Sequence, residues 1–495
     1  MNRTNARWTL FFGSLGCGMT VLETNIIAVV LPSIANDLRA DFASVEWVVS
    51  SYITCFVCSL LPAGSIADRL GRKKVLLFGI AAFSLTTLLC AVAPNSAFLY
   101  VMRGAQGISA SLLLAPSLAI IGHTFHRGVE RDEAWAFWGG FMGLMMVLSP
   151  VAGGAVAHAV GWRWAFGASL PILAALALGT MLFVQESKNA EHRPLDPMGI
   201  ATFSASMFGI VFLVIQGAAL GWMSREALAG AVLAAAAGAM FIRSQSRTAS
   251  GMLDLQLFRS RRFVGAVLAM IGYAGCAQVM ASMIPQYLQN GLGYSALEAG
   301  LGMLPFAGAM LAMPFLSQRL SSLTGWRCLA TGLSIISLGG FIACFASWNG
   351  WSSLMLVGTA VVGAGGGMIN GETSKAIIGA VSKERAGMAS GISATSRFLG
   401  ILAGYTGLSS LIISSIHWHA SELKPAHLTR GALDAIAAGT FHDSALLASA
   451  RALYGKGFGT AMMVSACTAL FLAGAVALLM SGRPEARVES QAPSR

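Results

Sequence analysis

Three ionisable residues interrupt long apolar segments: Glu23 in VLETNIIAVVLP, Arg103 in VMRGAQGISAS and Arg397 in SATSRFLGILAGYTG. An ionisable side chain inside such a segment is costly to bury and marks a functional site by default. A carboxyl group in an apolar medium binds a proton more readily than one in water. We therefore predict that Glu23 takes up and releases protons, with a permanently ion-paired structural carboxylate as the alternative.

Arg103 shares a helix face with Gln106 and Gly107, which follow three and four residues later. Glu23 and Arg103 both fall in the outer halves of their segments, so we expect them to meet at one depth. A nearby cation favours the charged carboxylate. A distance between them that changes with conformation would therefore couple protons to movement. Structural bonding between helices is the alternative for Arg103.

Arg397 lies in a stripe of small residues, which indicates either close helix packing or a polar cavity. We group it with polar, aromatic and methionine side chains of other apolar segments as a candidate substrate cavity, although each of them also suits a packed core. These residues are Met19, Asn25, Tyr52, Met142, Tyr273, Gln278 and Asn370.

Two further stretches have unusual spacing. GSIADRLGRKK, residues 64–74, places Asp68 and four cations on one tight turn, where glycines permit close helix approach and the basic residues favour the cytoplasmic side. GGFMGLMMVLSPVAGGAV, residues 139–156, combines a helix-kinking proline with small residues that suit close packing. Its candidate residues are Gly143, Pro150, Gly153 and Gly154.

The composition places these residues in a membrane. The 495-residue chain is 56% hydrophobic and only 11% charged, whereas soluble domains carry about 25% charge. A membrane helix needs roughly 20 apolar residues. Fourteen segments qualify: 8–33, 46–66, 75–93, 98–122, 135–158, 163–184, 199–217, 227–242, 263–284, 298–318, 327–346, 352–372, 387–415 and 458–480. The first is too long for a signal peptide, so we expect it to be retained.

The basic residues indicate the orientation. With fourteen alternating spans and a cytoplasmic N-terminus, most Lys and Arg fall in cytoplasmic segments. The few on the outer side are Arg39, Arg163, Arg225, Lys424, Arg430, Arg451 and Lys456. This asymmetry predicts a multi-pass plasma (inner) membrane protein with both termini cytoplasmic. It also explains the net charge of +11 without nucleic acid.

An internal repeat suggests how the spans are grouped. PFLSQRL at 314–320 matches GSIADRL at 64–70, and IPQYL at 284–288 matches LPSI at 31–34. Matches in register favour a duplicated six-helix unit of the kind found in secondary transporters. We predict a six-helix bundle over 1–184, a linker with two additional helices over 185–262, a second six-helix bundle over 263–480 and a cytoplasmic tail over 481–495. No role is assigned to the long outer segment, 416–457.

Signals for an enzyme or a metal site are weak. GGGMINGETSK at 365–375 lacks the lysine of a phosphate loop, and His417 and His419 have no further ligand at metal spacing. We therefore expect no enzyme activity, no metal and no cofactor apart from protons as the coupling ion.

Together the motifs resemble those of the major facilitator superfamily, in its fourteen-helix drug:proton antiporter branch. GSIADRLGRKK resembles the loop between the second and third helices, VMRGAQG the fourth-helix arginine motif and GLMMVLSPVAGG the fifth-helix antiporter motif. LETNIIAVVLPSI resembles the first-helix motif, and QNGLGYSALEAGLGMLP, residues 289–305, a second-half segment. Two positions depart from the branch: Glu23 stands where Asp is usual, and Ser149 stands where Gly is usual.

The resemblance implies a conformational latch in the 64–74 loop, formed by Gly64, Asp68, Arg69, Gly71 and Arg72. Asp68 would pair with Arg72 or with a helix N-terminus of the other half, where the helix dipole favours an anion. The alternative is a simple topology anchor.

We interpret the chain as a proton-coupled antiporter that exports amphipathic organic compounds, such as drugs or antibiotics, by alternating access. Its expected partners are a small-molecule substrate, protons and the lipid bilayer, and we expect it to be a monomer. The alternatives are a proton symporter for a small metabolite and a membrane sensor that binds a ligand without transporting it.

Overall fold

The computed structural model describes residues 3–39, 42–125, 128–188, 195–247, 251–319, 325–423, 433, 436 and 447–481. Within these residues the secondary structure is helical throughout, without strands. Thirteen helices are long and apolar enough to cross a membrane, which confirms the predicted all-α integral membrane class. The span predicted at 135–158 lies in α5, a 33-residue helix that is not among those thirteen.

Seven helices build the first part of the chain, which we call the N-half. They are α1 (Arg3–Asp37), α2 (Phe42–Leu70), α3 (Arg72–Ala91), α4 (Ser96–Thr124), α5 (Gly128–Val160), α6 (Trp162–Gly167) and α7 (Leu170–Phe183). The span predicted at 163–184 corresponds to one of the thirteen candidates, Trp162–Phe183, in which two helical segments, α6 and α7, meet near Ala168. Asn95 caps α4 by accepting a hydrogen bond from the amide of Phe98.

Two helices follow before the second part of the chain, α8 (Pro197–Leu220) and α9 (Arg225–Arg247). They pack against each other, and α8 also contacts α2 and α16 (Ala386–Leu423). Asp196 caps α8 through the amide of Gly199 and accepts a second hydrogen bond from Gln245 of α9.

The remaining helices form the C-half. They are η1 (Leu255–Arg259), α10 (Arg261–Tyr273), η2 (Ala274–Gln278), α11 (Met280–Asn290), α12 (Ala296–Gly302), α13 (Leu304–Arg319), α14 (Trp326–Asn349), α15 (Ser352–Ile378), η3 (Lys383–Arg385), α16 and α18 (Leu447–Met480). Most of 424–446, within the outer segment 416–457, and the tail residues 482–495 lie outside the described residues.

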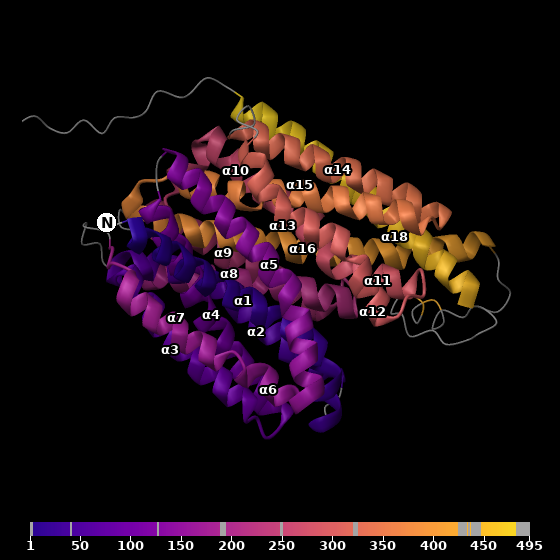
Figure 1. Ribbon diagram of the computed structural model, residues 1–495, viewed down its shortest axis with the longest axis horizontal. Coiled ribbons are helices and arrows are strands. Elements are labelled where there is room, and N and C mark those ends of the chain that lie inside the picture. Colours follow the sequence, from indigo (N-terminus) through magenta and orange to yellow (C-terminus); the bar gives the residue numbers. More distant parts are fainter. Residues whose placement is uncertain are drawn as a thin grey trace, which may run out of the picture.

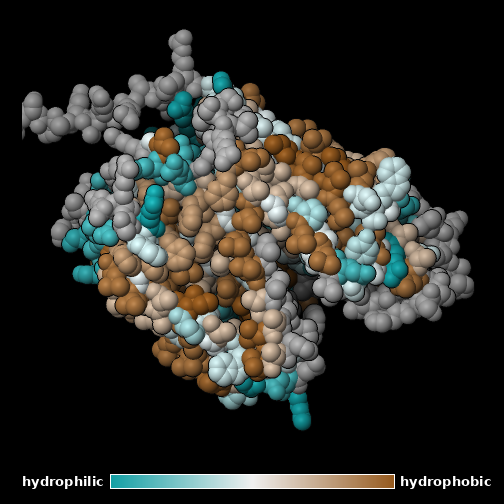
Figure 2. All heavy atoms as spheres, viewed as in Figure 1, coloured by the Kyte–Doolittle hydropathy of each residue, from teal (hydrophilic) through white to brown (hydrophobic). Residues whose placement is uncertain are grey.

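The two halves touch at one end and separate at the other. Contacts between them join α2 and α4 to α16, and α5 to α13 and α15. Figure 1 shows α6 of the N-half far from α12 of the C-half, so the halves diverge toward those helices. We call the end with the α2–α3 turn the latch end, and the opposite end the open end. In Figure 2 the outline of the molecule is notched at the open end.

The outer surface of the bundle suits lipid. Large apolar side chains on several helices are well exposed, among them Phe78, Leu182 and Phe471, and Figure 2 shows broad hydrophobic areas on the face in view. A soluble monomer rarely exposes such contiguous apolar area. The exposed surface therefore agrees with a multi-pass membrane protein.

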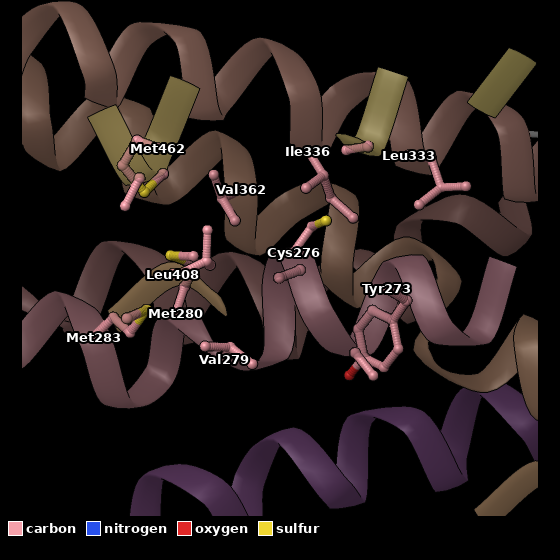
Figure 3. Close-up of a cluster of buried hydrophobic side chains, with 14 of the residues drawn as sticks. Tyr273, Cys276, Val279, Met280, Met283, Leu333, Ile336, Val362, Leu408 and Met462 are labelled. Carbon is pink, nitrogen blue, oxygen red and sulfur yellow. The ribbon is translucent and has the colours of Figure 1, made fainter. Parts of the chain in front are cut away.

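A π-helical turn interrupts the span predicted at 263–284. It comprises η2 and joins α10 to α11. Figure 3 shows this region beside the buried apolar cluster of the C-half, with Cys276 and Met280 among the cluster residues and the Tyr273 hydroxyl pointing away from the cluster. Single π-turns of this kind are frequent at functional sites.

Candidate functional site

Glu23 is buried inside the N-half, where α1, α3 and α4 meet. Its exposed fraction is 0%, and its Oε1 accepts a hydrogen bond of 3.0 Å from the Gln106 amide nitrogen. Arg103 Nη1 lies 3.6 Å from the same oxygen. The predicted meeting of Glu23 and Arg103 is therefore confirmed, and Gln106 stands between them as the direct hydrogen-bond partner.

Neighbouring groups hold this network in place. Gln106 Nε2 also donates to Thr87 Oγ1 at 2.8 Å, and Arg103 Nη1 donates to Gln106 Oε1 at 2.5 Å. Arg103 donates from Nε to the carbonyl oxygen of Val48 at 3.2 Å, and its guanidinium lies 4.2 Å from the centre of the Tyr52 ring. Within the described residues, Glu23 Oε2 has no hydrogen-bond partner. The arrangement can bind a proton at Oε2 without breaking the hydrogen bond to Oε1.

The sequence reasoning missed Thr87 in this network. A threonine in an apolar helix usually bonds to its own backbone, so its type and spacing gave no signal.

Asp68 ties the N-half to the C-half at the latch end. Its Oδ1 accepts from Arg72 Nη2 and from the amide of Gly387, both at 2.8 Å, and its Oδ2 accepts from the amide of Met388 at 2.8 Å. Gly387 and Met388 lie in the first turn of α16, where the helix dipole favours an anion. Asp68 thus makes both contacts that the sequence offered as alternatives.

The rest of the predicted latch surrounds Asp68. Arg72 is fully buried and donates to the carbonyl oxygen of Glu384 at 3.1 Å, which adds a second link to the C-half. Gly64 allows α2 to approach α16, because a Cβ there would overlap the carbonyl oxygen of Gly387. Gly71, with φ of 111°, makes the turn that follows Arg69.

A second link at the latch end joins α5 to α15. Lys375 Nζ lies 2.7 Å from Asp132 Oδ1 and 2.7 Å from Glu372 Oε1. Arg131 Nη2 donates to the carbonyl oxygen of Lys375 at 2.5 Å. These residues could not be singled out from the sequence, because charges at the ends of apolar helices are common.

Arg397 lies between the halves at the middle of the bundle. Its Nη1 donates to Asn370 Oδ1 at 2.9 Å and to Gln278 Oε1 at 3.5 Å. Its guanidinium lies 5.3 Å from the ring centres of both Trp138, in α5, and Tyr273, at the end of α10. Four residues of the predicted substrate cavity therefore meet here, together with Trp138, which the sequence analysis did not select.

The other predicted cavity residues have other described contacts. Met19, Tyr52 and Met142 are buried in the apolar cluster of the N-half, and Tyr52 belongs to the Arg103 network. Asn25 donates to the carbonyl oxygen of Val21 in its own helix at 2.9 Å. Among the described residues, none of these four side chains forms a hydrogen bond or ring contact with Arg397, so only part of the predicted set meets there.

The glycine-rich motif of α5 packs in two directions. Gly143 faces Leu311 of α13 in the C-half, whereas Gly153 faces Ile26 of α1 in the N-half. Pro150 and Gly154 fall within α5, but their side-chain surroundings are not among those that the structure describes. The two glycines that are described therefore serve close packing against both halves.

The described part of the chain contains no cluster of three or more His, Cys, Asp or Glu side chains that could hold a metal ion. The polar groups that meet inside the bundle are a carboxylate with its arginine and amide partners, and a lone arginine with neutral partners. Such groups suit proton exchange and ligand recognition.

Comparison with known proteins agrees with this architecture. The family model of the Major Facilitator Superfamily matches residues 13–405. The chain is 31% identical over 437 residues to multidrug resistance protein Stp of Mycobacterium tuberculosis, covering 88% of this chain and 80% of that protein. It is 30% identical to multidrug efflux pump LfrA of Mycolicibacterium smegmatis, covering 92% and 93% of the two chains.

The solved structure of the proton:xylose symporter XylE superposes with a TM-score of 0.62 at 14% identity, covering 96% of this chain and 95% of that one. This likeness concerns the fold. From the family match and the sequence identities together, the chain belongs to the major facilitator superfamily.

Proposed function

We propose that the protein is a proton-coupled antiporter that exports amphipathic organic compounds, such as drugs or antibiotics, by alternating access. The observation that carries this proposal is the carboxyl group of Glu23, which is buried at 0% exposure and has one oxygen without a hydrogen-bond partner among the residues the structure describes. The similarity to Stp and LfrA, which are named for multidrug resistance and efflux, supports export over import.

In this scheme Glu23 carries the proton, and the attraction between Glu23 and Arg103 depends on whether the proton is bound. A protonated Glu23 no longer attracts the guanidinium 3.6 Å away. Arg103 is bonded to the backbone of α2 at Val48, and α2 also holds Asp68 at the latch. Protonation of Glu23 in α1 can therefore act through Arg103 on α2 and alter how firmly α2 binds α16.

The orientation follows from the basic residues. We place the latch end in the cytoplasm together with both termini, so that the described conformation opens to the outside. The domain limits 1–184, 185–262, 263–480 and 481–495, the fourteen spans and a monomeric state belong to the same proposal. The link from Asp68 to α16 supports a latch that closes the cytoplasmic side.

The test is transport into inverted membrane vesicles under an imposed pH gradient, with ethidium, Nile red and fluorescein as cationic, neutral and anionic probes. We expect the parent to accumulate at least one probe, and Glu23→Gln to lose at least tenfold of the gradient-driven rate while still binding it. Glu226→Gln, which alters an exposed carboxylate in α9, is the matched control. Equal gradient-driven transport by the parent and Glu23→Gln would contradict the proposal, and gradient-driven loss of probe from the vesicles would indicate import.

A further inference from the structure

We propose that Arg397 binds an anionic oxygen of the substrate, so that the transported compounds include amphipathic organic acids such as carboxylates and phenolates. This inference deepens the proposed function. The binding of an anion by Arg397 does not depend on that function, but the statement that the anion is transported does. It begins from a charge that nothing in the described chain balances.

The partners of Arg397 are all neutral. Its Nη1 donates to the side-chain oxygens of Asn370 and Gln278, and its Nη2 reaches the Asn370 carbonyl at 3.4 Å and Ser374 Oγ at 3.3 Å. Within the described residues no carboxylate forms an ion pair with it. A guanidinium stays protonated in proteins, so the positive charge remains.

Other cations inside the bundle have acids beside them. Arg72 pairs with Asp68, Arg103 lies 3.6 Å from Glu23, and Lys375 contacts Asp132 and Glu372. A buried charge without a counter-charge is strongly unfavourable. Arg397 therefore differs from these cations in lacking an anion, and a substrate anion would supply it.

Two aromatic side chains with hydrogen-bond donors flank Arg397. The Tyr273 hydroxyl and the Trp138 indole nitrogen are buried and find no oxygen acceptor in the described chain. Their rings lie on the C-half and the N-half, each with its centre 5.3 Å from the guanidinium. Figure 3 shows the Tyr273 hydroxyl turned away from the apolar cluster behind it. An oxygen anion at Arg397 would have these two donors within its surroundings.

The position also suits a transported ligand. Arg397 belongs to α16 and Trp138 to α5, and the Asn370 amide donates across the halves to the Gly139 carbonyl at 3.3 Å. Arg397 and Gln278 keep partial exposure, whereas Trp138, Tyr273 and Asn370 are buried. Arg397 thus lies where the halves meet, so an anion bound to it would contact both halves.

The experiment compares three ligands with one ring system and different charge: 2-naphthoate, 2-naphthylmethanol and 2-naphthylmethylammonium. Binding of each radiolabelled compound to the purified full-length protein is measured by equilibrium dialysis. We expect the parent to bind naphthoate at least tenfold more tightly than the ammonium compound. Arg397→Gln should abolish this preference, and Arg397→Lys should keep part of it. Arg327→Gln removes a guanidinium beside another aromatic ring, Trp326, at 5.8 Å, and should change nothing.

Two results would overturn the inference: a parent that binds the ammonium compound as tightly as naphthoate, or an Arg397→Gln variant that weakens all three ligands equally. If Arg397→Gln does not fold, the charge preference of the parent and the result for Arg397→Lys still test whether Arg397 binds the anion. Because the assay measures binding without a pH gradient, failure of proton-driven transport would refute the proposed function and leave this result standing.

Discussion

Glu23 keeps one carboxylate oxygen in contact with the Gln106 amide, and its other oxygen has no partner in the described part of the chain. Gln106 also accepts from Arg103 and donates to Thr87. The glutamine therefore connects the acid, the cation and a third helix through one side chain. It is buried at 0% exposure, so water cannot easily replace it.

We expect Gln106→Leu to uncouple this network without removing its charges. A hydrogen bond to a charged group contributes about 1.5–3 kcal/mol, and its loss makes the charged carboxylate less favourable. The pH of half-maximal transport should therefore rise by roughly one to two units. The measurement is the pH profile of proton-driven probe transport in proteoliposomes. Gln216→Leu, which changes an amide of α8 with no hydrogen bond to Glu23, Arg103 or Thr87 within the described residues, is the control. An unchanged profile in Gln106→Leu would refute this role.

At the scale of elements, the latch is a contact between one side chain and the start of a helix. Asp68 of α2 binds two amides in the first turn of α16 and, at the same time, the buried Arg72 of α3. Glu186 makes a similar contact within the N-half, where it accepts from the amides of Lys73 and Lys74 at the start of α3. The two carboxylates therefore allow a matched comparison of links between and within halves.

We expect Asp68→Asn to open the latch end. The change leaves Arg72 buried without its counter-charge, and breaking a buried pair costs about 3–5 kcal/mol. Spin labels at Lys74→Cys and Ser382→Cys report the distance between the halves by pulsed electron paramagnetic resonance. Cys467→Ser removes an exposed native cysteine that would also be labelled. The distribution should move to longer distances in Asp68→Asn and stay in place in Glu186→Gln. Equal distributions in all three proteins would argue against the latch.

At the open end, an ion pair ties α1 to α6. Arg163 and Trp162 donate to Asp37 Oδ2, and these hydrogen bonds hold the pKa of the Asp37 carboxyl below its usual value. Because the pKa of Asp37 is lowered in the folded protein, the pair stabilises the folded state at pH values above the unfolded pKa of about 3.9. That stabilisation disappears as the pH falls through the lowered pKa.

We therefore expect the parent to melt at a higher temperature than Asp37→Asn near pH 6, with the difference shrinking to nothing at the acid end. The group is exposed, so the difference is small and falls with added salt. Melting of the purified protein across pH and salt measures it. A difference that persists at the lowest pH would assign the effect to packing instead.

At the scale of the whole molecule, much of the helical architecture followed from the sequence, because a membrane span requires a long apolar run. Glu23 and Arg103 could be paired from their depth alone. The π-turn at η2 and the contact of Trp138 with Arg397 could not be predicted. Helices buried on most sides have no single apolar stripe, so their sequences do not show which neighbour each residue faces.

The two links at the latch end bear on how the halves move. Asp68 joins α2 to α16, and Lys375 with Asp132 joins α15 to α5. If the halves rotate as rigid bodies, breaking the first link also separates the helices of the second. We therefore expect Asp68→Asn to lengthen the distance between labels at Glu130→Cys and Ala380→Cys, although the hydrogen bonds of Asp68 within the described residues go to α3 and α16 and not to α5 or α15. Adding Lys375→Gln should then increase the open population further. The effects of the two substitutions on the free energy of opening should add within about 0.5 kcal/mol, because the two sites share no partner. Opening confined to the α2–α16 labels would instead mean that α2 bends locally while the rest of the latch end stays closed.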